Sequence, residues 1–143
     1  VRTSWLFSEY GSNFVKTILR LAKERDSLSI VHDQTGCPTY AGDLAHAIIS
    51  LLQQPTSPRG IFHYCGNKSA TWYEFTKAIF QTAHQLDDSF RIPELNAITT
   101  EQYPLPAPRP AYSIMDCSRL ETEFGIKPSD WQKALREILR KID

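Results

Sequence analysis

Apolar residues in the first third of the chain alternate between strand-like runs and helical spacing. A run of β-branched and aromatic residues over 1–7 predicts a strand that ends at the turn formers 10–12. Apolar positions in 13–25 recur three and four residues apart with charged residues between them, which predicts a helix. A second strand is expected over 28–31. This alternation predicts an α/β fold whose first three strands belong to a mainly parallel sheet.

The remaining elements are marked by caps and stop signals. Asp43 is expected to cap a helix over 44–52, and residues 61–65, between two glycines, read as the third strand. The pairs Thr71/Glu74 and Ser118/Glu121 have the spacing of capping boxes. They predict a helix reaching about residue 85 and a short helix stopped by Gly125. The segment 129–132 opens the last helix.

Five prolines interrupt the stretch 92–113, so it cannot be regular helix. One interpretation is a low-complexity linker. The stretch also carries apolar residues, namely Leu95, Ile98, Tyr103, Leu105 and Tyr112. We therefore prefer an ordered loop wrapped over the domain.

The composition of the chain limits the classes of function that it can have. The 143 residues suffice for one domain, 1–143, and the 16 basic and 16 acidic side chains cancel. No net field therefore favours nucleic acid or an anionic membrane, and no apolar run approaches the roughly 20 residues that span a bilayer. The three widely spaced cysteines form no CxxC pair, which favours buried free thiols and a cytoplasmic setting.

The ends of the first two predicted strands are the best candidate for a binding site. Ligands of α/β sheets lie at the carboxyl ends of strands, where Trp5 and the segment 33–39 would meet on one edge. Trp5 offers a flat face and one donor to a sugar or base, but it fits a plain core position equally well. Asn13 is either a simple helix N-cap or a cap that also donates to a ligand.

Arg109 is a second candidate, because prolines on both sides hold it in a stiff loop. Its guanidinium could clamp a phosphate bidentately, and exposure to solvent is the alternative. Neither a glycine-rich phosphate loop nor a metal-ligand spacing occurs in the chain. No catalytic residue or metal ligand is therefore assigned.

Five motifs in order carry a family resemblance. Arg2-Thr3-Ser4-Trp5-Leu6-Phe7 and Asp33-Gln34-Thr35-Gly36-Cys37-Pro38-Thr39 are the most distinctive, joined by the segments 13–17, 21–25 and 108–113. Together they resemble the dTDP-4-dehydrorhamnose reductase family of the extended short-chain dehydrogenase/reductases, over essentially the whole chain. The strand at residue 1 and the absence of an initiator methionine lead us to expect the C-terminal part of such a protein.

The resemblance implies an activity for the parent protein. The family reduces the 4-keto group of a dTDP-linked sugar with NADPH or NADH, giving dTDP-L-rhamnose. The dinucleotide loop and the catalytic Tyr-x-x-x-Lys pair belong to the N-terminal part, so the cofactor is expected to bind mainly there. Tyr73 and Lys77 repeat that spacing in a late helix, where we interpret it as coincidence. The chain alone is expected to be inactive.

The resemblance also assigns site residues. It implies that Trp5, Arg109 and Asn13 bind the substrate, the last two near its diphosphate, and that Ser4 lies by the nicotinamide. Some members bind magnesium at a dimer interface through glutamates, one of them just after a Pro-Thr pair. Gly42 stands there in this chain, with Asp43 beside it, which puts magnesium and that mode of homodimer in doubt.

Two other functions stay open at this point. One is a non-catalytic regulatory subunit of the kind that binds methionine adenosyltransferase, which the missing N-terminal sequence would distinguish. The other is an epimerase or another reductase of the same superfamily, which Trp5 disfavours because many epimerases carry Asn there.

Overall fold

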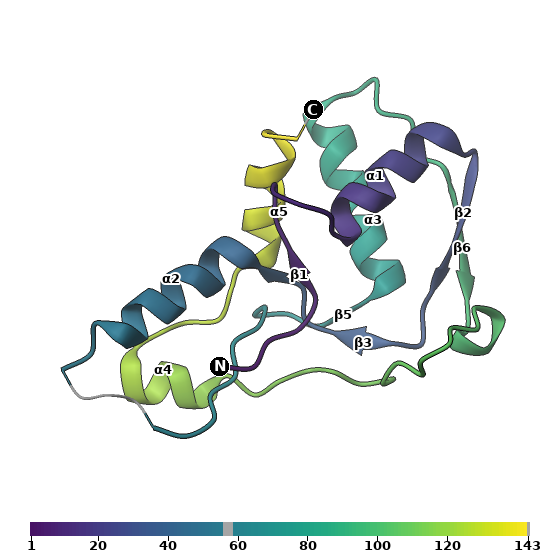
Figure 1. The fold of residues 1–143 in the computed structure, drawn as a ribbon. Helices are drawn as coiled ribbons and strands as arrows, with labels where there is room; N and C mark the ends of the chain where they lie inside the picture. The colour runs from purple at the N-terminus through teal and green to yellow at the C-terminus, as the bar shows by residue number, and fades with distance from the viewer. Residues whose placement is uncertain (56–58, 143) are drawn as a thin grey trace.

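Three amphipathic helices surround the main core of the molecule. The computed structural model describes residues 1–55 and 59–142. Helices α1 (Phe14–Glu24), α3 (Trp72–Leu86) and α5 (Trp131–Leu139) lie together in the upper part of Figure 1. Their apolar faces meet in a core that includes Phe7, Val15, Ile18, Phe75, Ile79, Phe80, Trp131, Leu135 and Ile138. No helix within the described ranges is long and apolar enough to span a membrane.

A smaller core lies between the other two helices. Helix α2 (Ala41–Leu52) and helix α4 (Ser118–Phe124) sit at the lower left of Figure 1. Their buried side chains are joined by residues of the connecting chain, giving the cluster Ala47, Leu51, Phe62, Tyr64 and Leu120. The observed helices follow the predicted ones closely in position, since the 3.6-residue spacing of apolar side chains is a local property.

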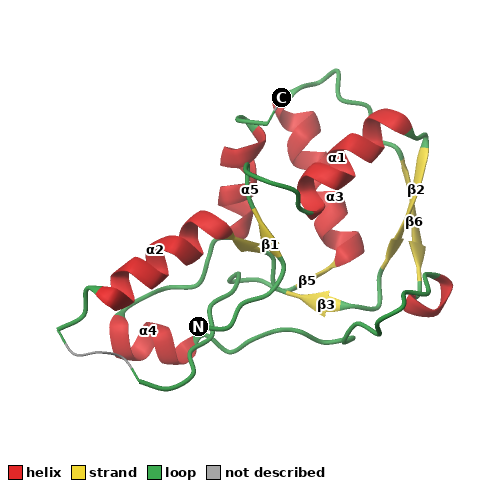
Figure 2. Ribbon diagram, viewed as in Figure 1, coloured by secondary structure: helices red, strands yellow, loops and turns green. Residues whose placement is uncertain are grey.

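The strands are short and pair with partners far away in the sequence (Figure 2). The pairs are β1 (Leu6–Phe7) with β4 (Thr39–Tyr40), β2 (Ser27–Val31) with β6 (Glu94–Ile98), and β3 (Thr35–Gly36) with β5 (Ala70–Thr71). The first two pairs are parallel and the third is antiparallel. The mainly parallel character is therefore confirmed. The expectation that the first three strands share one sheet is wrong for the described residues.

Two of the expected strands are reduced in extent. The first keeps only Leu6–Phe7 as strand, and the segment 61–65 forms a single parallel bridge between His63 and Arg2. That bridge is closed by hydrogen bonds from Arg2 N to Phe62 O and from Tyr64 N to Arg2 O. Only part of each segment finds a partner strand.

The helix caps show how much of the structure is local. At α3 both bonds of the predicted box form: Glu74 N donates to Thr71 Oγ1 at 3.1 Å, and Thr71 N donates to Glu74 Oε2 at 2.7 Å. Asn13 caps α1 as expected, and Asp130 caps α5. These motifs are confirmed because donor and acceptor lie within one turn of each other.

Two predicted caps are wrong. Helix α2 begins two residues before Asp43, with Tyr40 as N-cap, and the Asp43 carboxylate instead accepts a 2.6 Å hydrogen bond from Ser129 Oγ. Helix α4 has Cys117 at its N-cap, and Ser118 is already helical. Asp116 takes over the capping contact by accepting from Ser118 N at 2.9 Å. Gly125 ends α4 with a positive φ of 68°, as expected.

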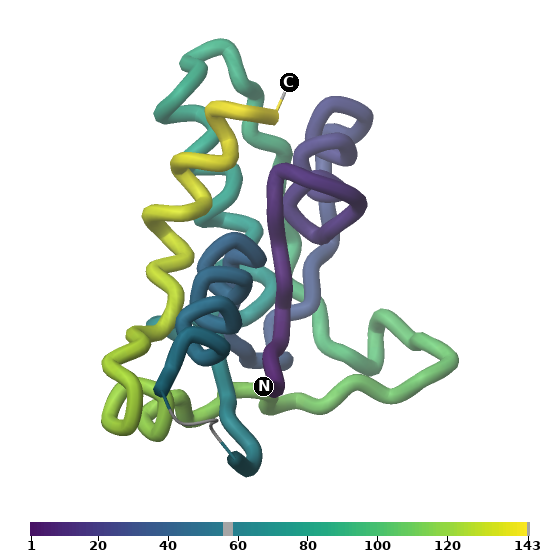
Figure 3. The backbone as a smooth tube through the Cα atoms, turned by 60° about the vertical axis from the view of Figure 1, so that its left-hand side comes forward, coloured from purple at the N-terminus to yellow at the C-terminus, as the bar shows by residue number. Residues whose placement is uncertain are grey.

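The proline-rich stretch is ordered but only partly packed. It contains β6, which the sequence did not predict, and the 3₁₀ turn Thr100–Gln102. Beyond that turn the segment 103–112 runs over the surface with Tyr103, Leu105 and Tyr112 exposed. Figure 3 shows this segment in green, projecting away from the helices. The prediction that these three side chains lie on a core is therefore wrong.

All three cysteines are buried free thiols, as predicted. They form one cluster against which Ile114 and Met115 pack, and the Sγ atoms of Cys65 and Cys117 lie 3.5 Å apart.

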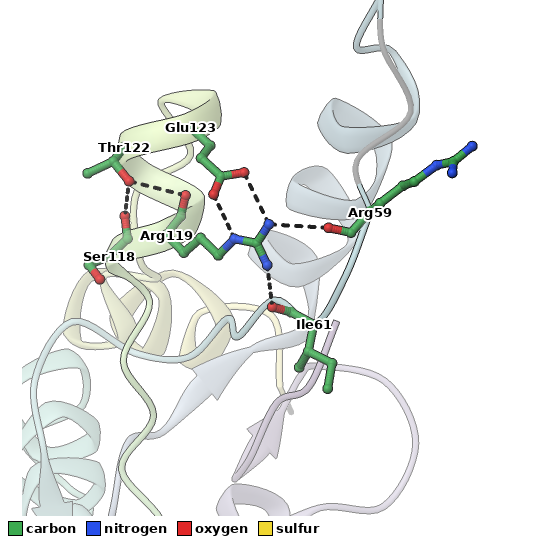
Figure 4. Close-up of polar contacts among 6 residues, drawn as sticks. All are labelled: Arg59, Ile61, Ser118, Arg119, Thr122 and Glu123. Atoms are coloured by element: carbon green, nitrogen blue, oxygen red, sulfur yellow. Dashed lines mark hydrogen bonds and ion pairs between the residues drawn. The ribbon is translucent and has the colours of Figure 1, made fainter.

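Arg119 joins α4 to the segment that leads into the smaller core (Figure 4). Its guanidinium donates to Ile61 O at 3.1 Å and to Arg59 O at 3.2 Å. It also pairs with Glu123 on its own helix and lies 4.1 Å from the centre of the Phe62 ring. One side chain thus supplies two backbone contacts, an ion pair and a cation–π contact.

Replacing Arg119 by alanine is expected to lower the free energy of unfolding by about 1–3 kcal/mol, because two carbonyl groups and the Phe62 ring lose their cationic partner. Urea unfolding measures the change. Arg20→Ala is the matched control. Among the described residues Arg20 pairs with Glu24 alone, on an exposed helix face, so its loss should cost at most about 0.5 kcal/mol. Equal effects of the two variants would contradict this role of Arg119.

Glu9 ties the loop after β1 to the C-terminal helix. Its carboxylate accepts from Lys141 Nζ at 3.1 Å and from Tyr40 OH at 3.1 Å. The pKa of Glu9 is lowered by its own backbone N–H, Lys141 and Tyr40, against the opposing effect of burial. The same contact raises the pKa of Lys141.

Because folding lowers the pKa of Glu9, its stabilising contribution is present above the ordinary value of 4.5 and is lost as the pH falls through the lowered value. Glu9→Gln should therefore make the acid side of the stability–pH profile shallower, as followed by thermal unfolding between pH 7 and pH 3. An identical acid slope in the wild type and Glu9→Gln would refute the assignment.

Candidate functional site

Trp5 has a backbone conformation that large side chains rarely adopt. Its φ is +51°, the only positive value at a non-glycine residue within the described ranges. Such a conformation costs on the order of 1–3 kcal/mol and persists only where the surroundings enforce it. Its carbonyl accepts from Thr39 N at 3.0 Å, which ties it to the start of β4. Strained residues of this kind cluster at functional sites.

The Trp5 ring is held on one face and along one edge. It stacks on Trp72, the first residue of α3, with ring centroids 3.5 Å apart and planes 6° from parallel. A Cβ atom on Gly36 would overlap Cε2 of the indole, so only glycine fits beside it. The two predicted strand ends therefore do meet, as expected. One ring face is covered by Trp72, so a ligand of Trp5 would use the opposite face or the free edge.

The N–H of Trp5 differs from those of the other two tryptophans. Trp72 Nε1 donates to Gln34 Oε1 at 3.2 Å, and Trp131 Nε1 donates to Lys68 O at 3.0 Å. The Nε1 of Trp5 makes no hydrogen bond within the part of the chain that the structure describes. A half-buried indole normally pairs its donor. The indole N–H of Trp5 is therefore open to a partner other than the described residues.

Two hydroxyl groups precede Trp5. Ser4 Oγ donates to Ser113 O over a long 3.4 Å. Thr3 Oγ1 is the one buried side-chain polar atom in the described residues that finds no hydrogen-bond partner. A buried hydroxyl without a partner costs free energy, so this edge of the chain has unused capacity for hydrogen bonding.

Asn13 uses its amide within its own loop. Its Oδ1 accepts from Lys16 N at 3.2 Å, and its Nδ2 donates to Ser8 O at 2.7 Å. A longer contact of 3.4 Å reaches Tyr10 O. These contacts confirm the N-cap interpretation, and contact with a ligand stays a prediction.

Arg109 is exposed and makes no hydrogen bond or ion pair among the described residues. Its segment is nevertheless fastened close to Trp5, because Thr35 N donates to Ala111 O at 2.8 Å and Ser113 N donates to Thr35 O at 2.9 Å. These bonds anchor the segment two residues beyond Arg109, beside Gly36. The structure therefore attaches the Arg109 segment to the Trp5 site without placing the guanidinium in it.

Gln34 and Trp72 take part in this site. The sequence analysis placed Gln34 in the segment expected to meet Trp5 but gave it no role of its own, and it missed Trp72. Gln34 is 5% exposed, and its Nε2 donates to Thr100 Oγ1 at 3.0 Å. Thr100 in turn donates from its backbone N and its hydroxyl to Asp33, and these two bonds lower the pKa of that carboxyl. The sequence showed Gln34 only as a turn residue and Trp72 only as the start of a helix.

Tyr73 and Lys77 lie one turn apart on α3, with Lys77 Nζ 5.9 Å from the centre of the Tyr73 ring. This is the ordinary geometry of neighbours four residues apart on a helix. No group of three or more His, Cys, Asp or Glu side chains suited to a metal ion occurs in the described ranges.

Comparison with known proteins identifies the family. The model of the RmlD substrate binding domain matches residues 1–143. A dTDP-4-dehydrorhamnose reductase of Aggregatibacter actinomycetemcomitans is 49% identical over 96% of this chain and 48% of its own length. The spore coat polysaccharide biosynthesis protein SpsK of Bacillus subtilis is 42% identical over 99% of this chain and 46% of its own length.

A solved structure gives the same assignment. The dTDP-4-dehydrorhamnose reductase of Bacillus anthracis, solved in complex with NADP, superposes with a TM-score of 0.85 at 39% identity. The superposition covers 98% of this chain and 47% of that protein. The chain thus spans about half the length of the relatives that it matches, and its α/β fold is that of the corresponding part of these reductases. The chain belongs to the RmlD substrate-binding domain family of the dTDP-4-dehydrorhamnose reductases.

Proposed function

We propose that this chain is the substrate-binding part of a dTDP-4-dehydrorhamnose reductase. The reaction would be reduction of dTDP-4-dehydro-L-rhamnose to dTDP-L-rhamnose by NADPH or NADH. Because the chain spans about half of its relatives, the complete reaction belongs to a longer protein. The names of relatives up to 49% identical support the reaction class.

The observation that carries the proposal is the geometry of Trp5. A tryptophan in a strained conformation, with one face stacked and its N–H unpaired among the described residues, is preorganised to receive a ligand on its remaining surface. An indole suits the apolar face of a sugar and can donate to one of its oxygens. We assign Trp5 to the nucleotide part of the dTDP-linked substrate, where its ring would cover the deoxyribose or the thymine base.

Arg109 and Asn13 are assigned to the diphosphate. A guanidinium binds phosphate oxygens through two parallel N–H bonds, and Arg109 has no competing partner among the described residues. Asn13 stands at the N-terminus of α1, where backbone N–H groups and the helix dipole favour an anion. Anchoring of the Arg109 segment at Thr35 would let it approach a ligand beside Trp5 at little entropic cost.

Ser4 is assigned to the nicotinamide side of the site. When bound, the dinucleotide supplies the hydride that reduces the keto group. The long bond of Ser4 Oγ and the unpaired Thr3 Oγ1 fit a polar group that arrives with the cofactor. The chain itself contributes binding and orientation, and we assign the proton donor to the other half of the protein.

Titration of the chain with dTDP, followed by calorimetry, tests the substrate site. Trp5→Ala is expected to weaken binding about tenfold or more, because it removes the ring and its free donor. Arg109→Gln should weaken binding by a similar factor, with a marked loss of salt dependence. Arg140→Gln at the end of α5 is the matched control and should bind as the wild type does. Equal affinity of Trp5→Ala and wild type would remove Trp5 from the site.

The purified chain is expected to be catalytically silent. Supplied with NADPH and the dTDP-linked keto-sugar, it should not make the absorbance at 340 nm fall faster than it does without protein. Turnover by the chain alone would overturn the division of roles proposed here, while leaving the reaction class intact.

A further inference from the structure

We propose that Gln34 is a positioning residue of the substrate site, which orients Trp5 through the indole N–H of Trp72. The inference rests on the proposed role of Trp5 in binding and adds the contact that sets its ring. Among the described residues Gln34 makes no hydrogen bond to Trp5. It binds Trp72 instead, the ring on which Trp5 stacks.

A chain of hydrogen bonds runs from Trp72 through Gln34 and Thr100 to Asp33. In each of these bonds only one of the two groups can be the donor. An indole N–H can only donate, so Gln34 must turn its oxygen toward Trp72 and its amide nitrogen toward Thr100. The Thr100 hydroxyl then accepts from Gln34 and donates its proton to Asp33 at 2.7 Å. With every role determined, the Gln34 amide has one orientation, and Trp72 has one partner that fixes the rotation of its ring.

Burial makes this contact hard to replace. Gln34 is 5% exposed, so water cannot easily substitute for its oxygen if the side chain is lost. The Trp5–Trp72 pair needs such an external restraint. With centroids 3.5 Å apart and planes 6° from parallel, the rings overlap almost face to face, which aromatic pairs do not favour on their own.

The same contacts connect the two parts of the proposed substrate site. Thr100 begins the 3₁₀ turn that leads directly into the segment carrying Arg109. Gln34 therefore hydrogen-bonds to Thr100, at the start of that segment, and to Trp72, the ring on which Trp5 stacks. No motif of the sequence assigns a function to this glutamine.

The test uses the three indole N–H signals in ¹H–¹⁵N NMR spectra of the chain, with and without dTDP. Gln34→Met keeps the length of the side chain and removes the amide. It should shift the signals of Trp72 and Trp5 and leave that of Trp131 in place, because Trp131 bonds to Lys68 O in the main core. It should also weaken dTDP binding about five- to tenfold. A purely structural role would shift all three signals together.

Thr100→Val is the second variant, which interrupts the contacts one step further from Trp72 at a half-buried site. It should shift the Trp72 and Trp5 signals in the same direction by a smaller amount, and it decides the question if Gln34→Met does not fold. Unmoved Trp5 signals, or moved signals with unchanged dTDP affinity, would overturn the positioning role. If wild type does not bind dTDP while Gln34→Met still shifts Trp5, the proposed function fails and the structural coupling stands.

Discussion

The indole of Trp5 can lie where it does only because residue 36 is a glycine. Any Cβ at that position would overlap the ring, and it would also come within 2.7 Å of Ser113 Oγ. This single close approach brings together the start of β1, the end of β3 and the segment after the prolines. It also brings the ring onto Trp72 at the beginning of α3. The candidate site is the place where these four segments meet.

The strain at Trp5 is offset by the contacts that converge on it. A positive φ costs on the order of 1–3 kcal/mol, and the apolar surface buried between the Trp5 and Trp72 rings offsets part of that cost. The hydrogen bond from Thr39 N to Trp5 O adds a further restraint on the backbone. A ring held this way loses little freedom when a ligand binds, which is the physical basis for treating it as a preorganised contact. The chain thereby presents a rigid aromatic surface where these segments meet.

The sequence was informative where structure is decided within one turn. The capping bonds of Thr71 with Glu74, the Asn13 cap and the Gly125 stop all form as their spacing indicates. The cap predicted at Asp43 does not form, because its carboxylate accepts a hydrogen bond from Ser129, 86 residues away. Strand β6 was invisible because Glu94, Asn96 and Ala97 have low strand propensity, and only pairing with β2 makes them a strand.

The candidate site was accessible from sequence only in part. Trp5 was found because a strand end and a family motif coincide there, although its positive φ and its stack could not be foreseen. Gln34 and Trp72 are 38 residues apart, and no local pattern links an amide in a turn to the first residue of a helix. Arg109 was chosen for its flanking prolines. These restrict the backbone of its segment but do not determine the direction of its side chain.

The most direct test of this account is a crystal structure of the chain with dTDP bound. The account predicts that Trp5 keeps its positive φ and its stack on Trp72, and that the nucleotide lies at the free face or edge of its indole. A nucleotide bound away from Trp5, or a Trp5 backbone relaxed to negative φ with the ring detached from Trp72, would contradict it.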